Sequence, residues 1–303
     1  MPVIFTRKSE ERSIVHDIVR IPVPYSPIMV ESKEIVVHRF EPSKSSPEHE
    51  LIFLHGIKNH NIPYLMWFAK RFARAKVRTW FLILPYHGER APKDWEGGEP
   101  FFSSSPSWCV QRFNEAVKDV LEVHAFIRNE AGSTLPISVM GVSFGGMIAI
   151  MALAQNPSLY KGIVCCAGGD WHWINWHSPY LERVRKEYAE KANEFGCQTE
   201  KDCVEKYRKN VEEVIKSFNS LNDIFEKAPI TCYHYDPASF APFVRQKILF
   251  VQPLFDRIIP RQSYRILRSF LKHKKVLFLP TGHKSFYLLR RFVARAVLSF
   301  LKE

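Results

Sequence analysis

The sequence predicts an α/β fold with a mostly parallel central sheet flanked by helices, together with one helical insertion. Apolar, strand-like runs alternate with stretches of helical periodicity along most of the 303 residues, as in chains built from strand–helix–strand units. Turn-forming glycines and prolines separate these runs. Hydrophobic residues make up 46% of the chain and charged residues 24%, which is typical of a globular protein with a large buried core.

The elements of the N-terminal half follow from their apolar periodicity. Two stretches with alternating apolar residues, 16–24 and 33–42, are joined through Pro-Tyr-Ser-Pro and indicate an antiparallel pair at the sheet edge. A strand, a helix, a strand, a loop and a helix are then expected, in this order, over residues 50–56, 63–76, 78–87, 88–106 and 107–129. The loop is rich in Gly, Pro and Ser and unusually long for such a connection, which indicates that it is shaped for function.

The second half continues the alternation. Residues 131–160 contain no charged side chain, but their glycines and serines divide them into a strand, a turn and a helix, so we expect a buried central element and no stable membrane insertion. Strands are expected over residues 136–141, 161–169, 245–253 and 274–280, and helices over 144–155, 261–272 and 284–302.

An insertion interrupts this pattern between residues 170 and 235. Its apolar residues recur at steps of three and four, which predicts a pair of charged, amphipathic helices. The residues of this stripe are Val204, Tyr207, Val211, Val214, Phe218, Leu221 and Phe225. We therefore expect one core formed by residues 1–169 and 236–303, with residues 170–235 lying on it.

Charge and cysteine content exclude several classes of protein. The net charge is +12, and residues 261–302 contain eleven Lys or Arg and no acid. No nucleic-acid-binding motif accompanies them, so we expect a solvated helical face and no nucleic-acid partner. Six cysteines are too few for a disulfide scaffold, and although Cys197 and Cys203 could pair, reduced thiols are expected. The first residues contain no apolar run long enough for a signal peptide, which favours a cytoplasmic protein.

A nucleophile is indicated by Gly141-Val142-Ser143-Phe144-Gly145, which stands between a buried strand and a helix. A G-x-S-x-G turn in this context pushes the serine hydroxyl out at the carboxyl edge of the sheet, and the turn is so tight that the residues two before and two after the serine must be small. The helix start directs free N–H groups toward developing negative charge. An inert packing turn is the alternative.

A serine hydroxyl needs a base to take its proton and a third group to orient that base. His283 directly follows the last predicted strand, whereas His273 and His234 follow none. Asp256 follows the preceding strand and is the expected acid. Asp170, which follows the strand before that, is the alternative acid.

With these residues the sequence resembles the α/β-hydrolase superfamily, from about residue 20 to the end of the chain. The order Ser143, Asp256, His283 matches the Ser…Asp…His order of that family. The resemblance implies an α/β-hydrolase fold in which the insertion forms a helical cap. It also implies a carboxylesterase- or lipase-like serine hydrolase that acts on a small apolar ester and requires no cofactor. A thioesterase or an acyltransferase would use the same triad, and a catalytically silent binding member of the fold is the alternative outside enzymes.

The resemblance also implies an oxyanion hole. His55-Gly56-Ile57 looks like the His-Gly motif of the family's oxyanion loop. The backbone N–H groups of Ile57 and Phe144 would then bind the oxyanion. His55 itself is expected to anchor the loop rather than act as a base.

Several other residues near the expected site have two interpretations. Residues 86–90 either position the substrate or hold the long loop. Trp171, Trp173 and Trp176 either wall the substrate pocket or form an apolar seam beneath the insertion. Asp170, His172 and His177 match no zinc signature in their spacing, so no metal is expected.

Overall fold

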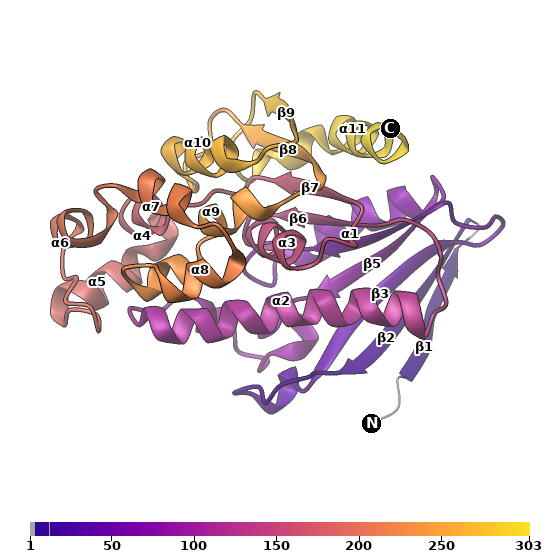
Figure 1. The fold of residues 1–303 in the computed structure, drawn as a ribbon. Helices are drawn as coiled ribbons and strands as arrows, with labels where there is room; N and C mark the ends of the chain where they lie inside the picture. The colour runs from indigo at the N-terminus through magenta and orange to yellow at the C-terminus, as the bar shows by residue number, and fades with distance from the viewer. Residues whose placement is uncertain (1–3, 12) are drawn as a thin grey trace.

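A nine-stranded mixed sheet forms the centre of the computed structural model, which describes residues 4–303 apart from residue 12 (Figure 1). Its strands are β1 Ile4–Glu11, β2 Ile14–Pro22, β3 Glu34–Pro42, β4 His49–Leu54, β5 Val77–Ile83, β6 Ile137–Val142, β7 Lys161–Cys165, β8 Lys247–Pro253 and β9 Lys274–Leu279. They are ordered β1-β2-β3-β5-β4-β6-β7-β8-β9 across the sheet. The pairs from β5 to β9 are parallel and the pairs from β1 to β5 are antiparallel. The predicted α/β fold with a mostly parallel sheet is confirmed.

The antiparallel edge differs from the prediction in one strand. The expected pair is present as β2 and β3, but β1 lies outside it and forms the edge. Residues 4–10 of β1 are exposed on both faces. A strand without a buried face has no reason to alternate apolar and polar side chains, so periodicity does not reveal it.

Helices cover both faces of the sheet. On one face, α1 (Asn61–Ala73) packs against α11 (Arg290–Lys302) over a core of phenylalanines and aliphatic side chains. On the other face lie α2 (Pro106–Asn129), α3 (Phe144–Gln155), α9 (Pro237–Phe240) and α10 (Arg261–Phe270). All but one of the residues of α3 are buried, which explains the uncharged run in the sequence. Among the described residues, no helix is long and apolar enough to cross a membrane.

The chain between β7 and β8 forms a helical segment that lies together at one end of the sheet (Figure 1). Its helices are α4 (Trp171–His177), α5 (Glu182–Glu190), α6 (Glu200–Cys203), α7 (Val211–Ser217) and α8 (Leu221–Glu226). The expected pair of helices is therefore broken into shorter ones. Ser220 accepts a hydrogen bond from the Asp223 backbone and starts a new helix, and Phe225 at the end of the predicted stripe is exposed.

Buried charges tie the two ends of this segment together. The Asp236 carboxylate, at its end, accepts hydrogen bonds from the backbone N–H groups of Asp170 (2.8 Å) and Trp171 (3.1 Å), at its start. Arg208, from the middle of the segment, pairs with Asp236 at 3.1 Å and lies 3.6 Å from Asp170. All three side chains are almost fully buried, so each charge depends on the others for compensation.

Candidate active site

Ser143 occupies the sharp turn between β6 and α3. Its backbone has φ 55° and ψ −121°, a conformation that L-residues rarely adopt. A Cβ at Gly141 would lie 2.1 Å from the Gly145 oxygen, and a Cβ at Gly145 would lie 2.4 Å from the His55 oxygen. Both glycines are therefore required by the close approach of backbone, as the G-x-S-x-G pattern predicts.

A chain of short hydrogen bonds joins the three residues that the sequence selects. His283 Nε2 lies 2.9 Å from Ser143 Oγ, and His283 Nδ1 lies 2.6 Å from Asp256 Oδ2. The three side chains follow the carboxyl ends of β6, β8 and β9, which lie in the parallel part of the sheet with β7 between β6 and β8. The expected last helix, 284–302, begins only at Arg290, because residues 285–289 form a 3₁₀ turn after His283.

The Asp256 carboxylate is held from four directions. Oδ1 accepts from the backbone N–H groups of Ile258 (2.7 Å) and Ile259 (2.9 Å), and Oδ2 accepts from the Tyr264 hydroxyl (2.6 Å) and from His283. Burial by itself raises the pKa of Asp256, but the hydrogen bonds from His283, Tyr264 and the backbone outweigh burial and hold the pKa below its usual value. The group is therefore an ionised, fixed acceptor for the imidazole.

Asp170, the alternative acid, has a different environment. It starts α4 by accepting a hydrogen bond from the His172 backbone, and it belongs to the buried cluster with Arg208 and Asp236. Burial raises its pKa to about 6, against the opposing effect of Arg208. No hydrogen bond joins it to His283 in the part of the chain that the structure describes.

Residues 55–57, which the sequence predicts to form an oxyanion loop, lie beside Ser143. A Cβ at Gly56 would lie 3.3 Å from Ser143 Cβ, and Ile57 lines the same cavity as Ser143. His55 is fully buried: its Nε2 accepts from the Leu84 N–H (3.0 Å) and its Nδ1 donates to the Gly56 oxygen (2.7 Å). Burial lowers the pKa of His55 to about 4, so it is a neutral anchor of the loop at neutral pH.

The cavity at Ser143 is small. It has a volume of about 20 Å³, and its lining residues are Gly56, Ile57, Asn61, Tyr64, Leu65, Val142, Ser143, Tyr180, His283, Lys284 and Phe286. A second cavity of about 180 Å³ shares Ile57 and Tyr180 with it and extends along residues 96–99 of the long loop. A larger cavity, of about 840 Å³, lies elsewhere, between the end of α3 and residues 218–222, and Ser143, Asp256 and His283 are not among its lining residues.

The three tryptophans lie away from the nucleophile. None of them is among the described residues that line the cavity at Ser143. Trp171 is buried against Phe113 and Tyr235 in the main core, and Trp176 stacks on Tyr188 within the helical segment (5.5 Å between ring centroids). The placement of these two fits the apolar-seam interpretation, whereas Trp173 packs against the imidazoles of His172 and His177 and lines a separate cavity beside Arg208.

Residues 86–90 hold the long loop in place. Arg90 is fully buried; its guanidinium donates to Asp119 (2.5 Å) and to the Ile83 oxygen (2.8 Å). The Tyr86 hydroxyl donates to Glu115 at 2.6 Å. These side chains are committed to the scaffold, and none of them lines the cavity at Ser143 among the described residues.

Sequence reasoning missed three residues near the site. Tyr264 holds Asp256 from α10, and Tyr64 and Tyr180 line the cavity from α1 and from the start of the helical segment. Tyr264 was detectable only as an apolar position of its helix. Tyr180 follows a Ser-Pro turn, which gives no indication of a cavity.

Comparisons with known proteins bear on the fold. Residues 51–288 match the sequence profile of the alpha/beta hydrolase fold family. A search of the curated proteins found no match. The structure is similar to a cold-adapted esterase from an Arctic intertidal metagenomic library, with 15% identity, a TM-score of 0.60, and 97% of this chain and 95% of that chain covered.

Two further solved structures show the same likeness. Acetyl xylan esterase 1 from Thermoanaerobacterium sp. is 13% identical, with a TM-score of 0.60 over 96% of this chain and 86% of that one. Pyrococcus horikoshii acylaminoacyl peptidase is 13% identical, with a TM-score of 0.63 over 96% of this chain and 42% of that one. At such identities these structures support the fold alone, whereas the profile match covers most of the sequence. This chain is a member of the α/β-hydrolase fold family.

Proposed function

We propose that the protein is a serine hydrolase that cleaves carboxylic esters through an acyl-enzyme on Ser143. One observation carries the proposal: the continuous hydrogen-bond chain from Asp256 through His283 to Ser143, which opens on a cavity at the carboxyl edge of the sheet. Each neighbour supplies what the next residue needs, because the ionised acid fixes the imidazole tautomer and the free Nε2 then accepts the serine proton.

The chemistry follows from these contacts. Ser143 Oγ attacks the ester carbonyl while its proton passes to His283 Nε2, and the imidazolium that forms is stabilised by Asp256. The same proton then goes to the leaving alkoxide, so that an alcohol departs and the acyl group stays on Ser143. A water molecule, deprotonated by His283, releases the acid. No cofactor takes part in this sequence of steps.

The oxyanion of the tetrahedral intermediate is expected to lie between two backbone N–H groups. Phe144 is the first residue of α3, where the N–H has no partner within the helix, and Ile57 follows the glycine that packs against Ser143. Removing one donor of this kind costs about 10²–10³ in kcat in a protease where it has been measured.

The cavities favour a short acyl group. A volume of about 20 Å³ at Ser143 fits a methyl-sized group, and the aromatic residues Tyr64, Tyr180 and Phe286 are among those that line it. The second cavity, about 180 Å³, is large enough for the alcohol portion. Because Tyr180 lines both, we propose that residues 170–235 form a cap and that this residue sets which esters fit.

Covalent labelling tests the proposal. A fluorophosphonate should label the wild-type chain once, at Ser143, and a folded Ser143→Ala variant should not be labelled. Ser158→Ala, at an exposed serine beyond the end of α3, is the matched control and should be labelled normally. Labelling that persists in Ser143→Ala would refute the assignment.

Turnover measurements then distinguish an esterase from a thioesterase or an acyltransferase. p-Nitrophenyl acetate should be hydrolysed faster than the butyrate and octanoate esters. Faster cleavage of the matching acetyl thioester, or acyl transfer to an added alcohol in preference to water, would assign a thioesterase or an acyltransferase instead. A labelled chain without turnover of any ester would indicate a binding member of the fold.

A further inference from the structure

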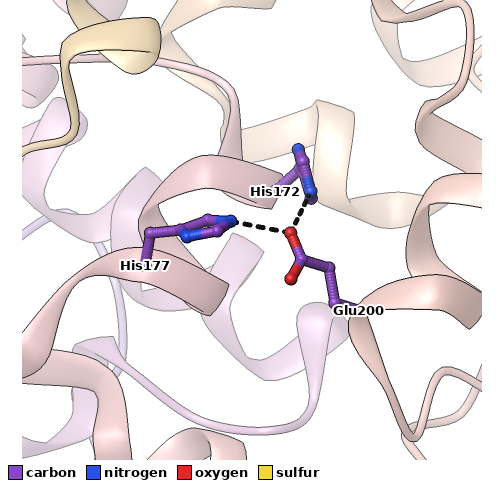
Figure 2. A group of neighbouring side chains, drawn as sticks. All are labelled: His172, His177 and Glu200. Atoms are coloured by element: carbon purple, nitrogen blue, oxygen red, sulfur yellow. Dashed lines mark hydrogen bonds and ion pairs between the residues drawn. The ribbon is translucent and has the colours of Figure 1, made fainter.

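Two histidines and one glutamate of the helical segment converge on a single point. His172 Nε2 lies 2.8 Å and His177 Nε2 lies 2.7 Å from the same oxygen, Oε1 of Glu200 (Figure 2). The three possible ligand atoms all lie within 4.8 Å of one another. The sequence separates Glu200 from the histidines by more than twenty residues, which is why the spacing of His172 and His177 with Asp170 indicated no site.

We propose that His172, His177 and Glu200 form a zinc-binding site that joins α4 to α6. Imidazole nitrogen and carboxylate oxygen are the donors that Zn²⁺ takes alongside thiolate, and two histidines with one carboxylate make a three-ligand set that leaves a fourth position for water. His177 and Glu200 each have 43% of their side chain exposed, so an ion can enter from solvent.

The distances fit a tetrahedral ion after a small adjustment. With bonds of about 2.0–2.1 Å, neighbouring ligand atoms of a tetrahedral site lie about 3.3 Å apart. The two Nε2–Oε1 distances are about half an ångström shorter than this, and the two Nε2 atoms lie within 4.8 Å of each other. Both imidazoles must therefore move away from Glu200 Oε1 and settle at a similar spacing from each other. Each imidazole must offer the lone pair of Nε2, and its proton then resides on Nδ1.

The backbone positions of the three ligands are fixed by caps. Asp170 accepts from the His172 backbone N–H at the start of α4, and a reciprocal Thr199–Asp202 capping box holds the start of α6, where Glu200 is the first residue. The buried cation Arg208 pairs with Asp236 and lies close to Asp170, and these two carboxylates offset its charge near the site. No residue of the triad belongs to this group, so the proposal does not depend on the proposed hydrolase activity.

The experiment is a calorimetric titration of the chelator-treated full chain with ZnCl₂. We expect one saturable site per chain and a rise in melting temperature with added zinc, because an ion that binds only the folded state stabilises it. His177→Ala and Glu200→Gln should each weaken binding at least about tenfold, since losing even an outer-shell partner of a zinc ligand costs about 10–100-fold. His273→Ala removes an exposed imidazole elsewhere and should bind zinc like the wild type.

Zinc K-edge X-ray absorption identifies the ligands directly. We expect nitrogen and oxygen neighbours at about 2.0–2.1 Å and no sulfur. Two results would overturn the proposal. One is unchanged affinity in folded His177→Ala and Glu200→Gln variants. The other is sulfur scattering together with loss of binding in Cys203→Ser, which would place the ion at the thiols of Cys197 and Cys203.

Discussion

Replacing Asp256 by asparagine is expected to disable the base without unfolding the protein. The wild-type carboxylate accepts four hydrogen bonds, two on each oxygen. The donors to Oδ1 are backbone N–H groups that cannot move, so the asparagine must keep its carbonyl oxygen there. Its NH₂ group then replaces Oδ2 and faces His283.

Replacing Oδ2 by an NH₂ group switches the imidazole of His283 to its other neutral tautomer. The NH₂ group donates to His283 Nδ1, the ring proton moves to Nε2, and Nε2 can no longer accept the proton of Ser143. The Tyr264 hydroxyl, by contrast, can rotate to accept instead of donate, so the local packing is kept. In a protease whose aspartate was replaced in this way, kcat fell about 10⁴-fold, which corresponds to about 5.4 kcal/mol of barrier.

The assay is steady-state hydrolysis of p-nitrophenyl acetate, with thermal denaturation as the check on folding. Asp256→Asn should lose about four orders of magnitude in kcat, with a smaller change in KM, because the lost interaction acts mainly in the transition state. Asp170→Asn is the matched control: it can still start α4 and should retain turnover. Near-normal kcat in Asp256→Asn, with collapse in Asp170→Asn, would refute the assignment of the acid.

Three further predictions concern the scaffold and the helical segment, residues 170–235. Gly145→Ala places a methyl group 2.4 Å from the His55 oxygen and should destabilise the fold by about 1–3 kcal/mol in urea titrations; an unchanged midpoint would contradict the close packing. Tyr180→Ala should widen the range of acyl lengths accepted, whereas Trp176→Ala should lower the melting temperature and leave the substrate profile unchanged; the reverse pattern would restore the tryptophans as the pocket wall. Because burial lowers the folded-state pKa of His55 to about 4, the unfolded chain binds more protons between about pH 6.5 and 4. His55 alone should therefore contribute a loss of about 3 kcal/mol as pH drops through that window, and His16, His38 and His49, whose pKa burial also lowers to about 4, should add to this loss; an unchanged urea midpoint would contradict the lowered pKa values.

The sequence predicts the features that depend on chain order. Buried strands are recognisable in the sequence as apolar runs, and the carboxyl ends of parallel strands lie at one edge of the sheet. Because each of Ser143, Asp256 and His283 follows such a run, all three could be placed at that edge from the sequence. The need for glycine two positions before and two positions after Ser143 was also predictable from the sequence, because the close contacts at Gly141 and Gly145 arise around one local turn.

Features that depend on packing between distant segments leave no such pattern. Tyr264 reaches Asp256 from the helix that follows it, Tyr180 reaches the cavity from the helical segment, and Glu200 meets His172 although α5 lies between them in the sequence. None of these contacts could be predicted from the spacing of the residues along the sequence. The tryptophans illustrate the converse: an aromatic cluster is visible in the sequence, but whether it faces substrate or core depends on which surface the helical segment covers.

Asp236 holds the start and the end of the helical segment together, and this anchoring affects how the segment can change in sequence and length. Because one carboxylate holds the backbone at both the beginning and the end of the segment, β7 and β8 keep the same local anchoring as long as the residues between them supply a buried cation such as Arg208. Extending a loop whose ends are already fixed adds only about 0.6 kcal/mol of closure entropy for each doubling of its length. A variant of this fold that keeps Asp236 and its buried cation can therefore lengthen or shorten the rest of this region without displacing the carboxyl ends of β7 and β8.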